Sequence, residues 1–179
     1  MKNHIIALLT LLVMSVSMHA QTISKSSHYT AILNLHGPDL VVTQVKMPYV
    51  APQFRLYTGN TIKIPIEVTI KNKGNEEARS GFGIHTSLKV QGNKTDGETI
   101  VRLAPNQSRT LKMTAHINAS LNGRYVRFLA TVDPPGGGRI PEQGAPKGGV
   151  VHETNENNNT RAVNIKLPVY TRLNPKNLD

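Results

Sequence analysis

The residues best suited to chemistry lie in an acidic, asparagine-rich run from residue 153 to residue 160, Glu-Thr-Asn-Glu-Asn-Asn-Asn-Thr. Calcium takes about 6 to 8 oxygen ligands from carboxylates, amides and carbonyls. If the preceding loop brings its ends together, five oxygen donors could converge on such an ion: Asp133, Glu153, Asn155, Glu156 and Asn158. Their spacing does not match an EF-hand, and asparagine commonly bonds to nearby backbone in turns. We therefore favour a structured turn whose two glutamates face water, with a calcium site as the alternative.

Basic residues form a second candidate site. Alternation along strands would place Tyr125 and Arg127 on the outer face of one sheet, beside Lys166 on the next strand. His85 and Lys89 would share that face from the preceding partner strand. Such a platform suits an anionic glycan or similar polymer, although antiparallel sheets commonly expose one polar side with no ligand. Two further cations in a loop, Arg139 and Lys147, are also candidate contacts.

Catalytic motifs are scarce. The histidines beyond the leader show no close metal-ligand spacing such as H-E-x-x-H, and the chain contains no G-x-S-x-G. We expect a protein that is not an enzyme and that needs no cofactor.

The N-terminus predicts export. A short basic start leads into an apolar run from Ile5 to Val16, followed by Ser17-Met18-His19-Ala20, which is typical of a secretory signal over residues 1–20. The run is too short to span a bilayer about 30 Å thick, and no second run of this length follows. The chain contains no cysteine. We expect a secreted or periplasmic protein whose core holds without disulfides.

The formal net charge of +10 favours polyanionic partners such as acidic polysaccharide. The alternative is that this charge only keeps an exported protein soluble. We expect no specific nucleic-acid ligand. A protein partner and any oligomeric state stay open.

Alternating aliphatic residues predict the fold class. Ile62, Ile64, Ile66, Val68 and Ile70 alternate with polar residues, as a strand with one buried face requires. Pro65 lacks a ladder donor, so we expect a local bulge there. Similar segments, punctuated by turn signals, indicate about seven strands in an all-β, Ig-like antiparallel β-sandwich of Greek-key type. The segments fall near residues 40–45, 62–70, 82–90, 99–103, 111–117, 126–132 and 163–167.

Five short motifs carry a family resemblance. They are Gly37-Pro38-Asp39-Leu40-Val41-Val42, Val68-Thr69-Ile70-Lys71-Asn72-Lys73-Gly74, Leu103-Ala104-Pro105-Asn106-Gln107-Ser108, Ala130-Thr131-Val132-Asp133-Pro134, and the acidic asparagine turn. In this order they resemble the CARDB family. Asn106 replaces the usual glycine of the third motif, and asparagine also adopts positive φ readily. The resemblance implies a bacterial, exported, non-catalytic, adhesion-related module with an Ig-like sandwich, and it carries no substrate.

The resulting domain plan has a signal (1–20), an N-terminal extension (21–36) that we expect to add a strand, a sandwich (37–168) and a loose C-terminal tail (169–179). A Gly/Pro-rich loop (134–152) is inserted where the family usually has a few residues, and it is either a mobile extension or a ligand loop. We expect a binding or adhesion module for a surface or matrix polymer or a partner protein. The alternative is a structural or accessory subunit of a surface assembly, associating through edge strands.

Overall fold

The computed structural model describes residues 36–138 and 149–173. The predicted signal, almost all of the N-terminal extension, the loop tip with Arg139 and Lys147, and residues 174–179 lie outside the described residues. Within the described part, no helix has the length and apolar character needed to cross a membrane. Its helical segments are the short 3-10 turns η1 (Pro52–Phe54), η2 (Ala119–Leu121) and η3 (Pro135–Gly138).

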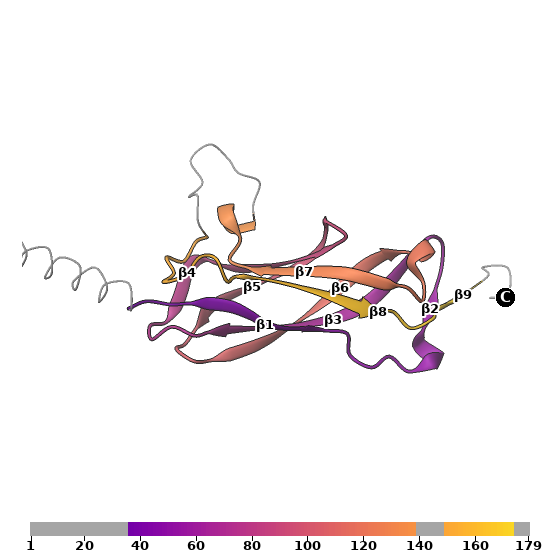
Figure 1. Ribbon diagram of the computed structural model, residues 1–179, viewed down its shortest axis with the longest axis horizontal. Helices are drawn as coiled ribbons and strands as arrows, with labels where there is room; N and C mark the ends of the chain where they lie inside the picture. Colours follow the sequence, from indigo (N-terminus) through magenta and orange to yellow (C-terminus); the bar gives the residue numbers. More distant parts are fainter. Residues whose placement is uncertain (1–35, 139–148, 174–179) are drawn as a thin grey trace, which may run out of the picture. The chain divides into compact units, whose positions relative to one another are not determined.

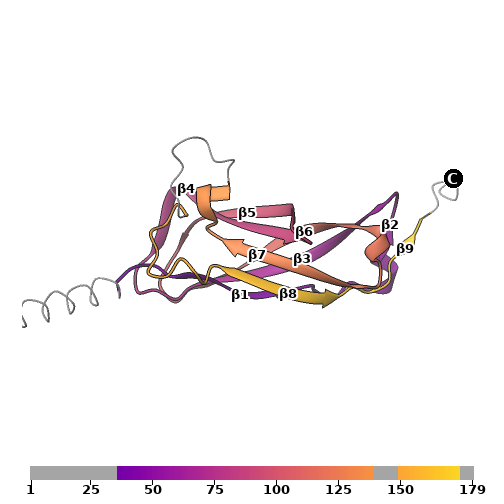
Figure 2. The same ribbon diagram turned by 45° about the horizontal axis from the view of Figure 1, so that its top comes forward.

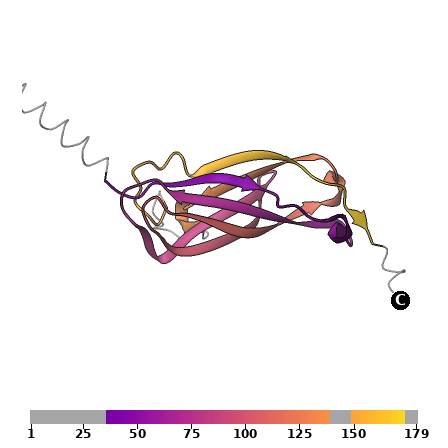
Figure 3. The same ribbon diagram turned by 90° about the horizontal axis from the view of Figure 1, so that it is seen from below.

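Two antiparallel sheets form a sandwich, which confirms the predicted all-β class (Figure 1). The three-stranded sheet has the order β1 (Leu40–Lys46), β3 (Thr61–Asn72), β6 (Ser108–Asn118). The four-stranded sheet has the order β5 (Asn93–Leu103), β4 (Ala78–Val90), β7 (Tyr125–Val132), β8 (Thr160–Lys166). β7 and β8 run side by side in Figure 2, and β1 lies next to β8 at one side of the sandwich in Figure 3.

The core lies between the sheets and follows the alternation in the sequence. The five aliphatic residues of β3 from Ile62 to Ile70 are at most 1% exposed. They pack in one cluster with inward residues of the other sheet, among them Ile84, Leu88 and Phe128. A register slip of one residue would place Lys63 and Glu67 in this cluster, so the burial of the aliphatic face sets the register.

Pro65 is accommodated without the bulge that we expected. The register of β3 against β6 is unbroken from Thr61 to Lys71, and Pro65 pairs with Thr114. The Thr114 N–H points away from β3 and bonds to Asp96. Pro65 and Thr114 are therefore a non-hydrogen-bonded pair of the antiparallel ladder. In such a pair the N–H of residue 65, which proline lacks, would have pointed away from β6. On that other side β1 has already ended, because its pairing with β3 stops at Glu67. No ladder bond is lost, so the strand stays regular.

β4 and β5 form a hairpin around Gln91 and Gly92, which both have positive φ (48° and 89°), as a tight two-residue hairpin turn requires. A register shift follows between Leu88 and Lys89, where Thr95 is the extra residue in β5. Thr95 Oγ1 accepts the His116 N–H at 2.7 Å, and Asp96 accepts the Thr114 N–H at 2.6 Å. Side chains of β5 therefore cap the outer edge of β6.

The C-terminal segment is not the loose end that we expected, as far as it is described. β9 (Thr171–Arg172) pairs in parallel with β2 (Leu56–Tyr57), and Tyr170 is only 4% exposed within the core. The Asn122 side chain bonds to both the N–H and the C=O of Tyr170, at 2.9 and 2.8 Å. One aromatic anchor and one carboxamide hold the segment, and neither gives a periodic signal in the sequence.

Candidate functional site

The predicted basic residues lie on one face of the four-stranded sheet. Tyr125 pairs with Lys166, and Lys89 pairs with Leu129, two residues along β7 from Arg127. Paired residues of antiparallel strands project to the same side, and alternate residues of one strand do so too. The outward positions of the three strands are His85, Ser87, Lys89, Tyr125, Arg127, Leu129, Thr131, Thr160, Ala162, Asn164 and Lys166. We call these residues the outer face.

Charge on the outer face has one sign. None of its positions in β4, β7 and β8 carries an aspartate or glutamate. Lys166 Nζ lies 5.0 Å from the centre of the Tyr125 ring, and this ring is 68% exposed. A cation over an exposed aromatic ring keeps its charge available to solvent while the ring limits its motion. The pair offers an anionic polymer a charged group and a flat apolar surface side by side.

His85 lies at the other end of the outer face. Its Nδ1 is 3.2 Å from Thr99 Oγ1 on β5, and the ring is partly buried. It occupies the space over Gly97, where an added Cβ would come within 2.5 Å of the imidazole Cε1. The glycine makes room for the ring, which therefore packs along the sheet beside β5.

The acidic turn connects two parts of the fold, the start of β1 and the segment before β8. Glu153 accepts the Leu40 N–H with one carboxylate oxygen and the Asn159 Nδ2–H at 2.8 Å with the other. Asn158 donates to Asp39 Oδ1 at 2.8 Å, and the Thr154 N–H bonds to Pro38 O at 2.9 Å. The turn before β8 is thereby fastened to the start of β1.

Burial raises the pKa of Glu153 to about 8; the hydrogen bond from Leu40 opposes this rise in pKa, and the charge of Glu156 adds to it. At neutral pH the group is therefore largely protonated. Glu153 is thus mainly a neutral, partly buried hydrogen-bonding group, rather than the water-facing carboxylate that we expected of both glutamates.

Asp133 closes the base of the inserted loop. Its two carboxylate oxygens accept the N–H groups of Val150 and Val151 at 3.0 and 2.8 Å. The residue has a φ of +46° and is 1% exposed, and burial raises its pKa. Gly149 lies so close that an added Cβ would clash with the carboxylate. The two ends of the loop therefore lie together, as the predicted calcium site would require. The contact that joins them is a pair of hydrogen bonds from the backbone to the Asp133 carboxylate, which stabilises the loop base.

The predicted calcium ligands are near one another without forming a cation site in this structure. Across the described ranges, no group of three or more His, Cys, Asp or Glu side chains could hold a metal ion. The carboxylate oxygens of Asp133 and Glu153 face N–H donors, which a cation would have to displace. Asn155 bonds to the Asn157 N–H, and Glu156 bonds to the Glu153 N–H, both within the turn.

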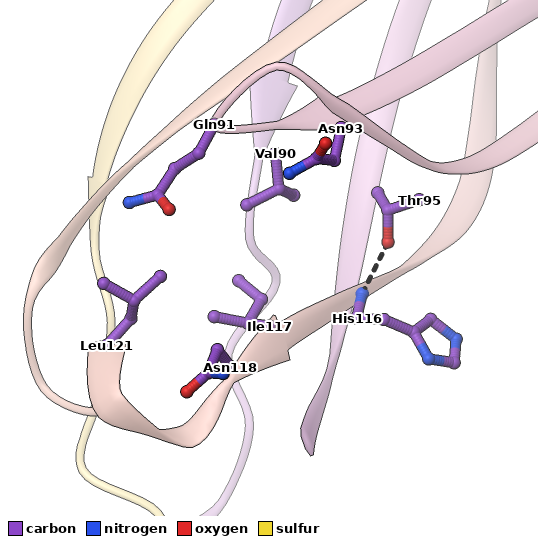
Figure 4. A pocket seen from close by; sticks show the side chains of 8 residues that line it. All are labelled: Val90, Gln91, Asn93, Thr95, His116, Ile117, Asn118 and Leu121. Atoms are coloured by element: carbon purple, nitrogen blue, oxygen red, sulfur yellow. Dashed lines mark hydrogen bonds between the residues drawn. The ribbon is translucent and has the colours of Figure 1, made fainter. Parts of the chain in front are cut away.

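One feature that we did not predict is a cavity of about 500 Å³ between the sheets (Figure 4). It lies beside the β4–β5 hairpin, the end of β6 and the turn η2. Its lining residues are Val90, Gln91, Asn93, Thr95, His116, Ile117, Asn118 and Leu121. Nothing in the sequence indicates that the turn at Gln91-Gly92-Asn93 faces the end of β6, because these residues come together only when the sheets pack.

Comparison with known proteins gives one family and a set of similar structures. A family model described as CARDB matches residues 37–163. Comparison with curated proteins gives no match. Among solved structures, the chain is similar to the CARDB domain of the PF1109 protein from Pyrococcus furiosus, in complex with di-metal ions. Identity is 24%, coverage is 73% of this chain and 89% of that chain, and the TM-score is 0.46. It is also similar to the 272–376 domain of a proposed cell surface protein from Methanosarcina acetivorans. For this domain the identity is 25%, the coverage is 73% of this chain and 91% of that chain, and the TM-score is 0.47.

Proposed function

The chain belongs to the CARDB family, and we propose that it is an exported, non-catalytic binding module whose outer face recognises an anionic polysaccharide or a similar surface polymer. Export is supported by the signal-like residues 1–20. Family membership names no ligand, so the proposal depends on the chemistry of the face.

The observation that carries the proposal is the alignment of Lys89, Arg127 and Lys166 with the exposed Tyr125 on a face with no carboxylate. By contrast, the outer side of the three-stranded sheet mixes signs, since Lys46 Nζ pairs with Glu67 Oε2 at 3.1 Å. An uncompensated positive surface attracts polyanions over roughly a Debye length, about 8 Å at physiological salt.

The test compares two charge-matched variants of the mature protein, with heparin and polygalacturonate as probes. One variant removes three cations from the outer face, Lys89→Ala, Arg127→Ala and Lys166→Ala. The other removes three from β3 and β6 of the opposite sheet, Lys63→Ala, Lys71→Ala and Lys112→Ala. We expect the first variant to weaken binding about tenfold or more, because three exposed contacts at roughly 0.5 kcal/mol each contribute about 1.5 kcal/mol. The second variant should weaken binding less than about threefold.

Raising NaCl from about 50 to about 300 mM should also weaken wild-type binding steeply, because the contacts are screened. Equal losses in both variants would show that net charge alone drives the association. Absence of binding to both probes at low salt would contradict the proposal.

The alternative, an accessory subunit that associates through edge strands, depends on which edges are open. The edges of the two sheets are β1, β6, β5 and β8. At β6 the N–H groups of Thr114 and His116 are already bonded to Asp96 and Thr95, which removes part of that edge as a template. This partial cover of β6 supports the proposed binding module over association through that edge. A protein partner for the outer face is the competing ligand class.

A further inference from the structure

The cavity between the β4–β5 hairpin and β6 has the dimensions of a small-ligand site. Its volume of about 500 Å³ falls within the roughly 300 to 1,000 Å³ usual for ligand pockets. It opens at the side of the sandwich where β5 and β6 form the edges of their sheets. This is a different place from the outer face, whose residues project from β4, β7 and β8.

The lining combines an apolar floor with carboxamides. Val90 and Ile117 are 6% and 1% exposed and belong to the core. Gln91, Asn93 and Asn118 supply the polar groups, and each carboxamide both donates and accepts hydrogen bonds. Sugar hydroxyls do the same, and the C–H face of a pyranose ring is apolar, so both parts of the lining have a counterpart in a sugar.

The described part of this lining carries no formal charge, although the chain as a whole carries +10. Among the lining side chains that the structure describes, none belongs to Lys, Arg, Asp or Glu, and the one titratable member is His116. Figure 4 shows the imidazole of His116 turned away from the space around which Gln91, Ile117, Asn118 and Leu121 are grouped. A charged ligand would find no opposite charge here to offset the loss of its hydration shell, whereas a neutral ligand loses much less hydration free energy on binding.

The walls are held in place before any ligand arrives. The Gln91 N–H bonds to Arg127 O at 3.1 Å, which joins the hairpin to β7. The Thr95 hydroxyl fixes the His116 backbone at 2.7 Å, and Asn118 Oδ1 accepts the Ser120 N–H at 2.9 Å at the start of η2. A preorganised wall lowers the entropy cost of binding.

We propose that this cavity is a binding site for a neutral sugar unit, with the carboxamides of Gln91, Asn93 and Asn118 bonding to its hydroxyls over the floor of Val90 and Ile117. The proposal is independent of polyanion binding by the outer face. Together the two sites would let the module engage a polymer with charged and uncharged units.

The test is a titration followed by backbone amide NMR, with the mature protein at about 50 and about 500 mM NaCl. The probes are cellotetraose, maltotetraose, mannotetraose and chitotetraose, all neutral. We expect saturable shifts for at least one probe, confined to residues 90–95 and 116–121. The affinity should be the same at both salt concentrations, because no charge is involved.

Two variants locate the contacts. Asn93→Ala removes one carboxamide, and Gln91→Asn shortens another while keeping a residue that tolerates positive φ. Each should weaken binding about fivefold, as expected for the loss of one or two hydrogen bonds. Asn164→Ala on the outer face is the matched control and should leave affinity unchanged. The amide spectrum of each free variant shows whether its fold is intact.

Three results would overturn the proposal: no shifts with any probe at about 10 mM, a concentration that detects even very weak sites; shifts centred on the outer face; or binding that high salt abolishes. Unchanged affinity in both cavity variants would also overturn it. Polyanion binding by the outer face could persist in every one of these cases, so the two proposals fail separately.

Discussion

Glu153 links the start of β1 to the turn before β8 through two hydrogen bonds, one from the Leu40 backbone and one from the Asn159 carboxamide. The Asn159 Oδ1 atom is buried and accepts no hydrogen bond within the described chain. The two ends of an amide group have nearly the same shape, so either end can face Glu153. If this amide is turned over, Oδ1 accepts the proton that Glu153 retains at neutral pH.

Glu153→Gln should therefore be well tolerated, because glutamine resembles the protonated carboxyl group. At about pH 4, where the folded and the unfolded protein both largely hold the Glu153 proton, we expect the free energy of unfolding to change by less than about 1 kcal/mol. Glu153→Ala should lose about 1 to 3 kcal/mol by leaving the Leu40 N–H without its acceptor. Urea denaturation measures both. Similar losses in the two variants would contradict a neutral hydrogen-bonding role.

The same group predicts a pH dependence. The pKa of Glu153 is about 8 in the folded protein and near the usual 4.5 when unfolded, so the folded state holds the proton more tightly. Its contribution to stability is complete below about pH 4.5 and is lost as pH rises through about 8. Wild type should therefore lose stability between about pH 4.5 and pH 8, and Glu153→Gln should lose less. Parallel pH profiles for the two proteins would disprove the assignment, since their other titrating groups are identical.

Tyr170 offers a second test at the scale of one residue. Its ring is 4% exposed, and its hydroxyl is buried without a hydrogen-bond partner in the described residues. Tyr170→Ala should cost about 3 kcal/mol, as for other buried aromatic residues. Tyr170→Phe should change stability by less than about 0.5 kcal/mol, because it removes only an unsatisfied polar atom. Thermal or urea unfolding of the two variants tests whether the C-terminal segment is anchored. If it is anchored, the alanine variant alone loses stability, and if it is loose, neither variant does.

At the scale of elements, the bulge at Thr95 explains how the open side of the sandwich is protected. The extra residue in β5 lets Thr95 and Asp96 reach the edge of β6, where their oxygens accept two backbone N–H groups. Natural sheets commonly cover such edges because an unpaired edge recruits other strands. The same bulge shapes one wall of the cavity, since Thr95 lines it.

Removing these caps should make the protein associate. In the variant Thr95→Ala with Asp96→Ala, two N–H groups of β6 lose their partners, and we expect concentration-dependent dimers or larger species in sedimentation velocity. The control Thr131→Ala removes a hydroxyl contact between β7 and β8, 3.1 Å from Thr160 Oγ1, without opening an edge, and should sediment like wild type. A double variant that stays as wild type would show that β6 is protected in another way.

At the scale of the whole molecule, two sheets packed by aliphatic side chains place the candidate surfaces apart. The outer face points away from the core, the cavity opens between the sheets at one side, and the acidic turn fastens β1 to the segment before β8. The net charge of +10 belongs to the whole chain, which is why the test of the outer face needs a control that removes the same charge elsewhere. Salt dependence then separates the proposed ligands, since polyanion binding should weaken with salt and neutral sugar binding should not.

Much of this fold could be predicted from local patterns. Period-two alternation identified the seven main strands, and positive φ at Asn106 confirms that asparagine replaces glycine in its turn. These features depend on residues close in sequence, so alternation and turn chemistry are sufficient to find them. The short β2 and β9 could not be found in this way, because each has two residues and exists only through the other.

The sequence by itself determined which side chains face inward, where the chain turns and which family it resembles, because each of these depends on neighbours a few residues apart. Only the tertiary structure decided what the acidic turn does, why Pro65 needs no bulge and that three carboxamides line one cavity with an apolar floor. Those outcomes depend on contacts between residues far apart in the chain, and on burial, which turned Glu153 from an expected surface charge into a neutral hydrogen-bonding group.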